Sequence, residues 1–326
     1  MRVIFFGTSE FAVPSLEHLA ASGHHIIMCV TQPDRPQGRG LARESSAVKR
    51  AARHLALPLL QPERLQVRLF EDLHPEVGVV AAYGQLIRRE LLELPSRGMV
   101  GVHPSLLPKY RGAAPVAWAL LKGETTTGVT IFRLSERVDA GEVISQRRVA
   151  VEPGEDADAL TRRLAQLGAQ ELVSALEAMS AGRATFTPQD ESTASLAPKL
   201  TKAQGRIDWR KPAAAIERLV RAVVPWPGAT TDWRGAPLKV WRATLRTEEA
   251  SSPHPAPGTV VQLTPDALSV ATGQGILDLR EVQPAGRRRM SVNAFLAGHP
   301  VHVGERFGVT SDKWHVASNT NDDRKT

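Results

Sequence analysis

Residues 2–10 read Arg-Val-Ile-Phe-Phe-Gly-Thr-Ser-Glu, an apolar run that passes directly into a polar turn. A short apolar run that ends in a turn is typical of a strand buried on both faces of a sheet. The residues after the turn include Phe11, Leu16 and Leu19, which favour a helix. A strand, a turn and a helix in this order predict the first unit of a parallel α/β sheet.

The same alternation continues through the first half of the chain. We expect further strands at 26–31, 77–82 and 99–103, a later strand pair at 128–134 and 142–149, a helix around Val48 and Leu55, and a long helix over 156–181. Buried strands separated by helices indicate a parallel sheet covered by helices. Residues 1–182 are therefore expected to form one α/β domain.

The pattern changes after residue 182. Residues 183–205 are polar and contain two prolines, which predicts a linker. Residues 206–309 contain one helix-like stretch, 213–223, and short strands separated by Gly and Pro at 238–241, 258–263, 267–272 and 275–282. Short strands at regular spacing favour a small β-barrel. The polar end, 310–326, is expected to be a disordered tail.

Composition limits the classes of protein to consider. The 326 residues carry a formal net charge of +7, which weakly favours a polyanionic partner. No apolar run is long enough to span a bilayer, and the N-terminus has no signal-peptide pattern, so no membrane association is expected. The one cysteine, Cys29, lies in an apolar run and is interpreted as a buried small side chain in a cytoplasmic protein.

Two residues are candidates for chemistry on position alone. His103 ends an expected internal strand, and an α/β sheet binds its ligands beyond the carboxyl ends of such strands. A histidine there can move a proton near neutral pH, or it can be a structural residue. Asp139 lies in a turn before a strand, where it can pair with His103 or close an Asx-turn. The residues by themselves leave these readings open.

A resemblance to a known family narrows the choice. Residues 103–112, His-Pro-Ser-Leu-Leu-Pro-Lys-Tyr-Arg-Gly, closely resemble the signature of the formyltetrahydrofolate-dependent formyltransferases. Further stretches at 6–14, 30–40, 82–84, 225–229, 239–241 and 283–286 resemble the methionyl-tRNA formyltransferase branch, and the similarity covers roughly residues 1–308. The resemblance implies a Rossmann-like N-terminal catalytic domain and a C-terminal barrel resembling an OB-fold. The sequence contains no cluster of metal ligands and its remaining histidines are scattered, so no metal is expected, and we expect a monomer.

The resemblance also implies the substrates and the residues that bind them. The formyl donor would be 10-formyltetrahydrofolate, and the acceptor would be methionine carried by initiator tRNA. The family's folate-binding loop falls on Ser105, Leu106, Leu107 and Pro108. Its catalytic His and Asp fall on His103 and Asp139, which would orient the site, stabilise the transition state and help to move protons.

The family's third catalytic residue, an Asn two positions before the His, is replaced by Gly101. That Asn is expected to donate a hydrogen bond to the formyl oxygen, and loss of one such donor typically costs about 10²–10³ in rate. Two alternatives follow. Either restoring Asn at 101 raises the chemical rate, or a neighbouring group or water already fills the position and Asn would clash with it.

Two basic features are candidates for binding tRNA. The loop 35–43 is rich in Pro, Gly and Arg, and the family uses it to contact the acceptor arm; its candidate residues are Arg35, Arg39 and Arg43. Basic residues between 199 and 246, among them Lys202 and Arg206, together with residues 287–289 form a possible footprint for phosphates. Both features can also be solvated surface.

Two other functions are compatible with parts of the chain. Formyl transfer to a small amine would use the same 103–108 pattern but would not need the basic second half. A tRNA- or folate-binding relative without catalysis is favoured only by Gly101.

Overall fold

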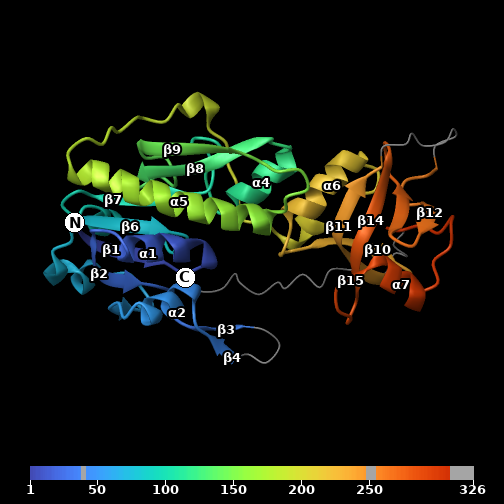
Figure 1. Cartoon of the computed structure of the whole chain (residues 1–326), viewed down its shortest axis with the longest axis horizontal. Helices are drawn as coiled ribbons and strands as arrows, with labels where there is room; N and C mark the ends of the chain where they lie inside the picture. Colours follow the sequence, from blue (N-terminus) through green and yellow to red (C-terminus); the bar gives the residue numbers. More distant parts are fainter. Residues whose placement is uncertain (38–41, 247–254, 309–326) are drawn as a thin grey trace, which may run out of the picture. The chain divides into compact units, whose positions relative to one another are not determined.

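The computed structural model describes residues 1–37, 42–246 and 255–308, and it divides into two compact units. The first comprises residues 1–200, and the second begins at residue 201. Figure 1 shows the elements of each unit in sequence colours.

A seven-stranded sheet with the order β5-β2-β1-β6-β7-β8-β9 forms the centre of the first unit. Its bounds are β1 Arg2–Gly7, β2 His25–Val30, β5 Leu59–Leu60, β6 Val77–Ala81, β7 Met99–His103, β8 Thr126–Arg133 and β9 Val143–Ala150. The first five are parallel, whereas β8 pairs antiparallel with β7 and β9 antiparallel with β8. The expected strands and the Rossmann-like parallel sheet are confirmed, with two antiparallel strands added at one edge.

Helices of the first unit are α1 Val13–Ala20, α2 Ala47–His54, α3 Arg89–Leu92, α4 Pro115–Lys122 and α5 Ala157–Ser180. Helix α5, the expected long helix, begins where the Asp156 side chain accepts a hydrogen bond from the Ala159 N–H. Gly168 allows it close to the sheet, since a Cβ there would lie 2.8 Å from Cγ1 of Val102. Helix α5 therefore covers the sheet face on which Val102 lies.

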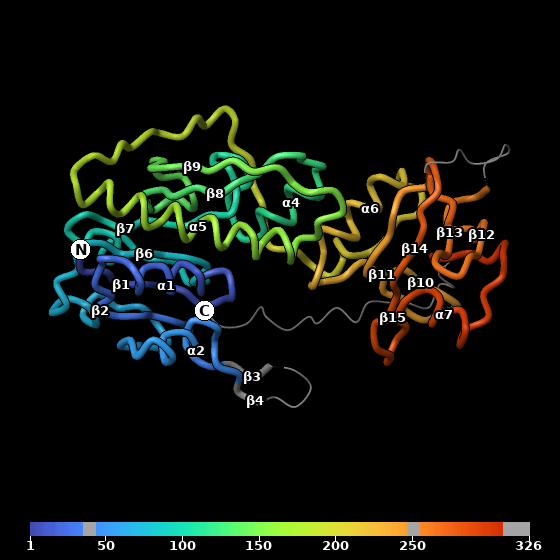
Figure 2. The backbone as a smooth tube through the Cα atoms, in the orientation of Figure 1, coloured from blue at the N-terminus to red at the C-terminus, as the bar shows by residue number. Residues whose placement is uncertain are grey.

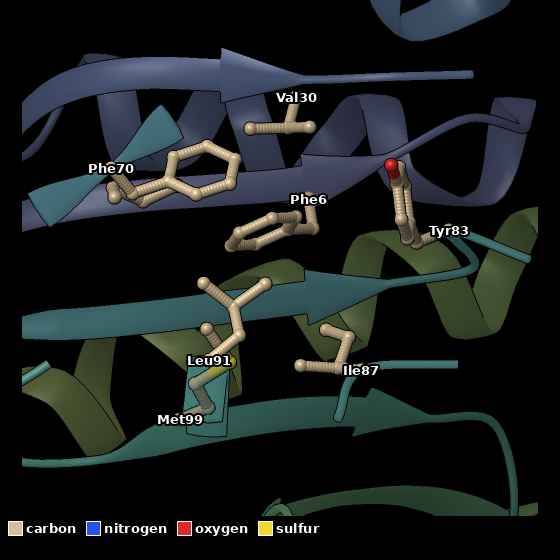
Figure 3. Close-up of a cluster of buried hydrophobic side chains, with 8 residues drawn as sticks. Phe6, Val30, Phe70, Tyr83, Ile87, Leu91 and Met99 are labelled. Carbon is tan, nitrogen blue, oxygen red and sulfur yellow. The ribbon is translucent and has the colours of Figure 1, made fainter. Parts of the chain in front are cut away.

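The opposite sheet face is covered by a separate hydrophobic cluster. Figure 3 shows Phe6, Val30 and Met99 on the strands, facing Phe70 and Leu91 from the connecting segments. Successive side chains of a strand point to opposite faces, so residues 99, 101 and 103 of β7 share this face. The candidate residues Gly101 and His103 therefore lie on the same sheet face as this cluster, nearer to the carboxyl end of β7.

Residues 183–200, which we call the strap, run back along the first unit after α5 (Figure 2). Val143 of β9 and Thr187 exchange two backbone hydrogen bonds of 2.8 and 2.9 Å. Arg111 pairs in the same way with the strap, donating to Ser195 O and accepting from the Ala197 N–H. Residues 183–205 have the polar composition of a linker, but these backbone hydrogen bonds hold residues 183–200 on the first unit.

The second unit is an antiparallel sheet with the order β10-β11-β14-β13-β12, and β15 pairs with β14. Its elements are β10 Ala229–Trp233, β11 Ala236–Leu245, β12 Val260–Thr264, β13 Ala267–Ala271, β14 Ile276–Pro284, β15 Met290–Ser291, α6 Ala213–Ala222 and α7 Val292–Gly298. The second domain was expected as one helix followed by the short strands of a small barrel, and the structure shows one helix followed by an antiparallel sheet. Strands β10 and β15 and helix α7 were not expected, and the tail 310–326 lies outside the described residues.

Two expectations from composition can be compared with the described ranges. Within 1–37, 42–246 and 255–308, no helix combines the length and the apolar character needed to cross a membrane. Cys29 is fully buried, and burial raises the pKa of its thiol to about 12. Its interpretation as a buried small side chain is therefore confirmed.

Candidate active site

The candidate site lies at the carboxyl ends of three neighbouring parallel strands. Strands β1, β6 and β7 end at Gly7, Ala81 and His103 and are adjacent in the sheet. Two side chains tie the segments after β1, β2 and β6 together, because Thr8 Oγ1 and Gln32 Nε2 each donate 2.8 Å hydrogen bonds to Tyr83 O. This is the sheet edge at which α/β proteins bind ligands.

The His103 imidazole is buried and has defined roles for its two nitrogens. Its Nε2 lies 2.9 Å from Tyr110 O, and a carbonyl oxygen can only accept, so Nε2 carries a proton. In the neutral ring Nδ1 is then the free basic nitrogen. It faces Oδ2 of Asp139 at 3.6 Å. The structure thus brings together the two residues that the sequence could not place next to each other.

Asp139 is held by its backbone as well as by its carboxylate. Its Oδ2 accepts a 2.8 Å hydrogen bond from the Gly112 N–H, and its own φ is +50°, a conformation that non-glycine residues rarely adopt. Gly141 must be glycine, because a Cβ would lie 1.8 Å from Arg133 O. The Asp139 carboxylate is therefore fixed next to His103 by surrounding structure that keeps a strained turn in place.

A polar network from the strap supports this turn, and no pattern in the sequence indicates it. Gln189 Nε2 donates to Asp139 O at 2.9 Å and to Gly141 O at 2.7 Å. Its Oε1 accepts from Nε and Nη2 of Arg111 at 3.1 and 2.8 Å. Arg111 also binds both oxygens of Glu191. Because Arg111 is buried and precedes Gly112, the network joins the two loops that hold the Asp139 carboxylate.

Glu191 is the charged member of this network at the surface. Hydrogen bonds from Arg111 and Arg137 lower the pKa of its carboxyl from the ordinary 4.5 to about 2. Its neighbours in sequence are polar and show no hydrophobic periodicity, so the sequence carried no signal for this role.

Hydrogen bonds from neighbouring strands hold the backbone of the loop that is expected to bind folate. Leu107 N–H donates to Thr130 Oγ1 at 3.1 Å, and Thr130 Oγ1 donates to Ser105 O at 2.7 Å. Gln146 Nε2 donates to Leu107 O at 2.7 Å. Residues 105–108 are thereby attached to β8 and β9, with Leu106 and Pro108 partly exposed.

Gly101 lies directly opposite Phe132 in the β7–β8 pair. A Cβ at residue 101 would lie 2.5 Å from Cε1 of Phe132 and 2.8 Å from Cδ1 of Leu134. Of the two alternatives for Gly101, the structure favours a position that is already filled, and the group that fills it is apolar.

The candidate tRNA residues belong to both units. Arg39 and the side chains of Arg35 and Arg43 lie outside what the structure describes, although the backbone forms a hairpin of β3 Arg35–Gln37 and β4 Ala42–Glu44. Lys202 and Arg206 are exposed on the second unit.

Several other residues of the basic run are already in ion pairs, namely Arg210 with Asp208, Arg221 with Glu217 and Arg234 with Glu305. Among the described residues, no group of three or more His, Cys, Asp or Glu side chains could hold a metal ion.

Comparison with known proteins identifies the family of the chain. Residues 1–176 match the formyl transferase family and residues 199–300 its C-terminal domain. A methionyl-tRNA formyltransferase from Roseiflexus castenholzii is 46% identical over 313 residues, which cover 94% of this chain and 99% of the relative.

Solved structures share the fold at low identity. The N-formyltransferase from Helicobacter canadensis, in complex with folinic acid and dTDP-3-aminofucose, has a TM-score of 0.67 at 15% identity, over 86% of this chain and 98% of its own. Methionyl-tRNA formyltransferase from Clostridium thermocellum has a TM-score of 0.54 at 13% identity, over 76% of this chain and 95% of its own. On the family matches and the relative together, the chain belongs to the formyl transferase family, in its methionyl-tRNA formyltransferase branch.

Proposed function

We propose that the chain transfers the formyl group of 10-formyltetrahydrofolate to the amino group of methionine on initiator methionyl-tRNA. The observation that carries the proposal is the pair His103–Asp139, in which Nδ1 and Oδ2 are 3.6 Å apart at the carboxyl edge of the sheet. Membership of the family indicates the reaction type, and Nδ1 of His103 is a base that can accept the proton released in the reaction.

The acceptor amine attacks only when it is neutral, and it must lose a proton after attack. Nδ1 of His103 is the basic nitrogen, since Nε2 already donates to Tyr110 O. A proton taken up at Nδ1 makes an imidazolium whose charge faces the Asp139 carboxylate. The 3.6 Å separation lies beyond a direct hydrogen bond, so Asp139 does not occupy the Nδ1 lone pair, which remains available to an amine N–H.

Folate, when bound, supplies the activated formyl group. We assign its binding to residues 105–108, whose backbone is attached to Thr130 and Gln146. A second feature fits a polar heterocycle at this edge. Tyr83 Oη is buried and has no hydrogen-bond partner among the described residues, and burial raises the pKa of this hydroxyl to about 12, so it remains a donor.

The tRNA would bind through positive charge. Lys202 and Arg206 are exposed and have no ion-pair partner among the described residues, so both remain available to phosphates. Arg35, Arg39 and Arg43 are assigned to the acceptor arm on the resemblance alone. We expect the chain to act as a monomer in the cytoplasm.

The test is formylation of charged initiator tRNA by the purified chain with 10-formyltetrahydrofolate. His103→Ala serves as the control for a contaminating activity. Product from methionyl-tRNA, and none from an amino sugar nucleotide, is expected. Formylation of the small amine alone would favour the alternative acceptor, and no product from either would contradict the proposal.

A further inference from the structure

The cross-strand pair of Gly101 and Phe132 contains an unusual combination of small and large residues. The two residues are direct partners in the antiparallel pairing of β7 and β8, so their substituents point to the same face. The Phe132 ring occupies the space that a side chain at 101 would take, with Cε1 and Cζ at 2.5 and 2.7 Å from the position of a Cβ. An aromatic residue covering a glycine in the neighbouring strand is a recognised stabilising arrangement in sheets.

The same ring contacts His103. The centroids of the Phe132 and His103 rings are 6.4 Å apart, and the planes meet at 86°, an edge-to-face arrangement. Phe132 is 4% exposed and His103 5% exposed, so the contact lies in the interior of the unit.

The hydrogen bond of the His103 ring leaves one rotation of the imidazole unconstrained, and the contact with Phe132 restricts that rotation. The hydrogen bond to Tyr110 O fixes Nε2, and the backbone fixes Cβ. These two points define a line about which the ring can still turn, and Nδ1 lies off that line. The direction of Nδ1 therefore depends on what packs against the ring, and the buried Phe132 side chain is a packing partner.

We propose that Phe132 is a positioning residue for His103, and that residue 101 is glycine because the Phe132 ring takes the space of any side chain there. The ring sets the plane of the imidazole so that Nδ1 faces Asp139 Oδ2. A side chain at 101 and a phenylalanine at 132 exclude each other. The part of this inference that concerns the reaction rests on the function proposed above, whereas the packing part does not.

A double-mutant cycle tests both parts. Its members are the wild-type chain, Gly101→Asn, Phe132→Ala and the double variant. Each is measured by thermal unfolding, by single-turnover formylation with saturating substrates, and by steady-state formylation for KM of both substrates. Overpacking should lower the Tm of Gly101→Asn by about 2–10 °C. In the Phe132→Ala background the same Asn should lower Tm by less than half as much, because the ring is gone.

The rate of single-turnover formylation should fall when Nδ1 of His103 is no longer held facing Asp139. Gly101→Asn, which displaces the ring, and Phe132→Ala, which removes it, should each slow single-turnover formylation by about tenfold or more, with KM for both substrates within about twofold. Phe70→Ala is the matched control: this buried phenylalanine belongs to the same sheet face but has no ring contact with His103, so it should lower Tm and leave the rate within about twofold.

Three results would overturn the inference. Additive Tm changes across the cycle would show that residues 101 and 132 do not compete for space. A Gly101→Asn rate equal to or above that of the wild type would show that the position lacked a donor instead. Slowing by Phe70→Ala as large as that by Phe132→Ala would mean that the rate reports core integrity only. If the wild-type chain formylates nothing, the proposed function fails, and the Tm cycle still tests the packing.

Discussion

Gln189 should control activity through the backbone of the Asp139 turn. Its carboxamide makes four hydrogen bonds, two to the carbonyl oxygens of Asp139 and Gly141 and two from the Arg111 guanidinium. Gln189→Leu keeps the approximate size and removes all four. The Arg111 side chain is 7% exposed, and its Nε would lose the partner that it has in the structure.

The expected cost follows from these contacts. An unsatisfied buried donor costs about 1–3 kcal/mol, whereas the two carbonyl groups are only partly buried, so water can replace their partner. We expect a loss of about 2–3 kcal/mol in the free energy of unfolding, seen as a Tm lower by about 4–12 °C. Because a shift of the turn by about 1 Å can cost up to 10² in rate, single-turnover formylation should fall by about 10- to 100-fold.

Gln189→Glu distinguishes the two functions of the carboxamide, which accepts hydrogen bonds from Arg111 and donates hydrogen bonds to the Asp139 turn. A carboxylate still accepts from Arg111, so most of the stability should remain, but it cannot donate to the two carbonyl oxygens and repels them. This variant should therefore be nearly as slow as Gln189→Leu at a Tm close to that of the wild type. A fully active Gln189→Glu would refute the reasoning, since the Asp139 turn would then not depend on these two hydrogen bonds.

Four further outcomes are expected. His103→Ala and Asp139→Ala should each lower the formylation rate by about 10² or more with the fold intact by circular dichroism; near-normal turnover of either would remove that residue from the mechanism. The pKa of Glu191 is lowered to about 2, so its contribution to stability is complete above pH 4.5 and is lost as the pH falls toward 2. In urea unfolding, the free energy of unfolding of Glu191→Gln should therefore decline less steeply over this pH range than that of the wild type. Equal declines in the two proteins would contradict the ion-pair account. Tyr83→Phe should stabilise the free chain by about 1 kcal/mol and raise KM for the folate by about 2- to 10-fold; unchanged KM would exclude the hydroxyl as a folate ligand. Lys202→Ala should reduce the slope of log K for tRNA against log[salt] by about 0.7–0.9, and an unchanged slope would place Lys202 away from the phosphates.

Much of the architecture could be predicted because its signals are local. Strand β7, at 99–103, and the long helix near 156–181 follow from apolar runs and helical spacing within a few residues. His103 and Asp139 were each recognisable as candidates, since one ends a strand and the other precedes one. Strand β10 and helix α7 were missed because residues 229–233 and 292–298 have short, weak patterns next to Gly and Pro.

The strap has the sequence features of a linker for a different reason. Its residues are polar and have no periodicity, and what holds them is a set of hydrogen bonds to residues far away in sequence. Gln189 meets Asp139 across 50 positions and Arg111 across 78. No local pattern encodes such a contact, because it exists only once the order and direction of the strands have been set.

The α/β class of the first unit, the β class of the second, the family, and the two polar residues at the end of the sheet could all be derived from the amino-acid sequence. The three-dimensional arrangement was needed to show that Nδ1 of His103 faces Asp139, that the strap supports the Asp139 turn, and that the Phe132 ring fills the space at Gly101. Hydrophobic periodicity indicates only which face of a helix or strand is buried. The direction of an imidazole nitrogen and the room for a side chain depend on which distant residue lies opposite, and that is set here by the pairing of β7 with β8 and by the path of the strap.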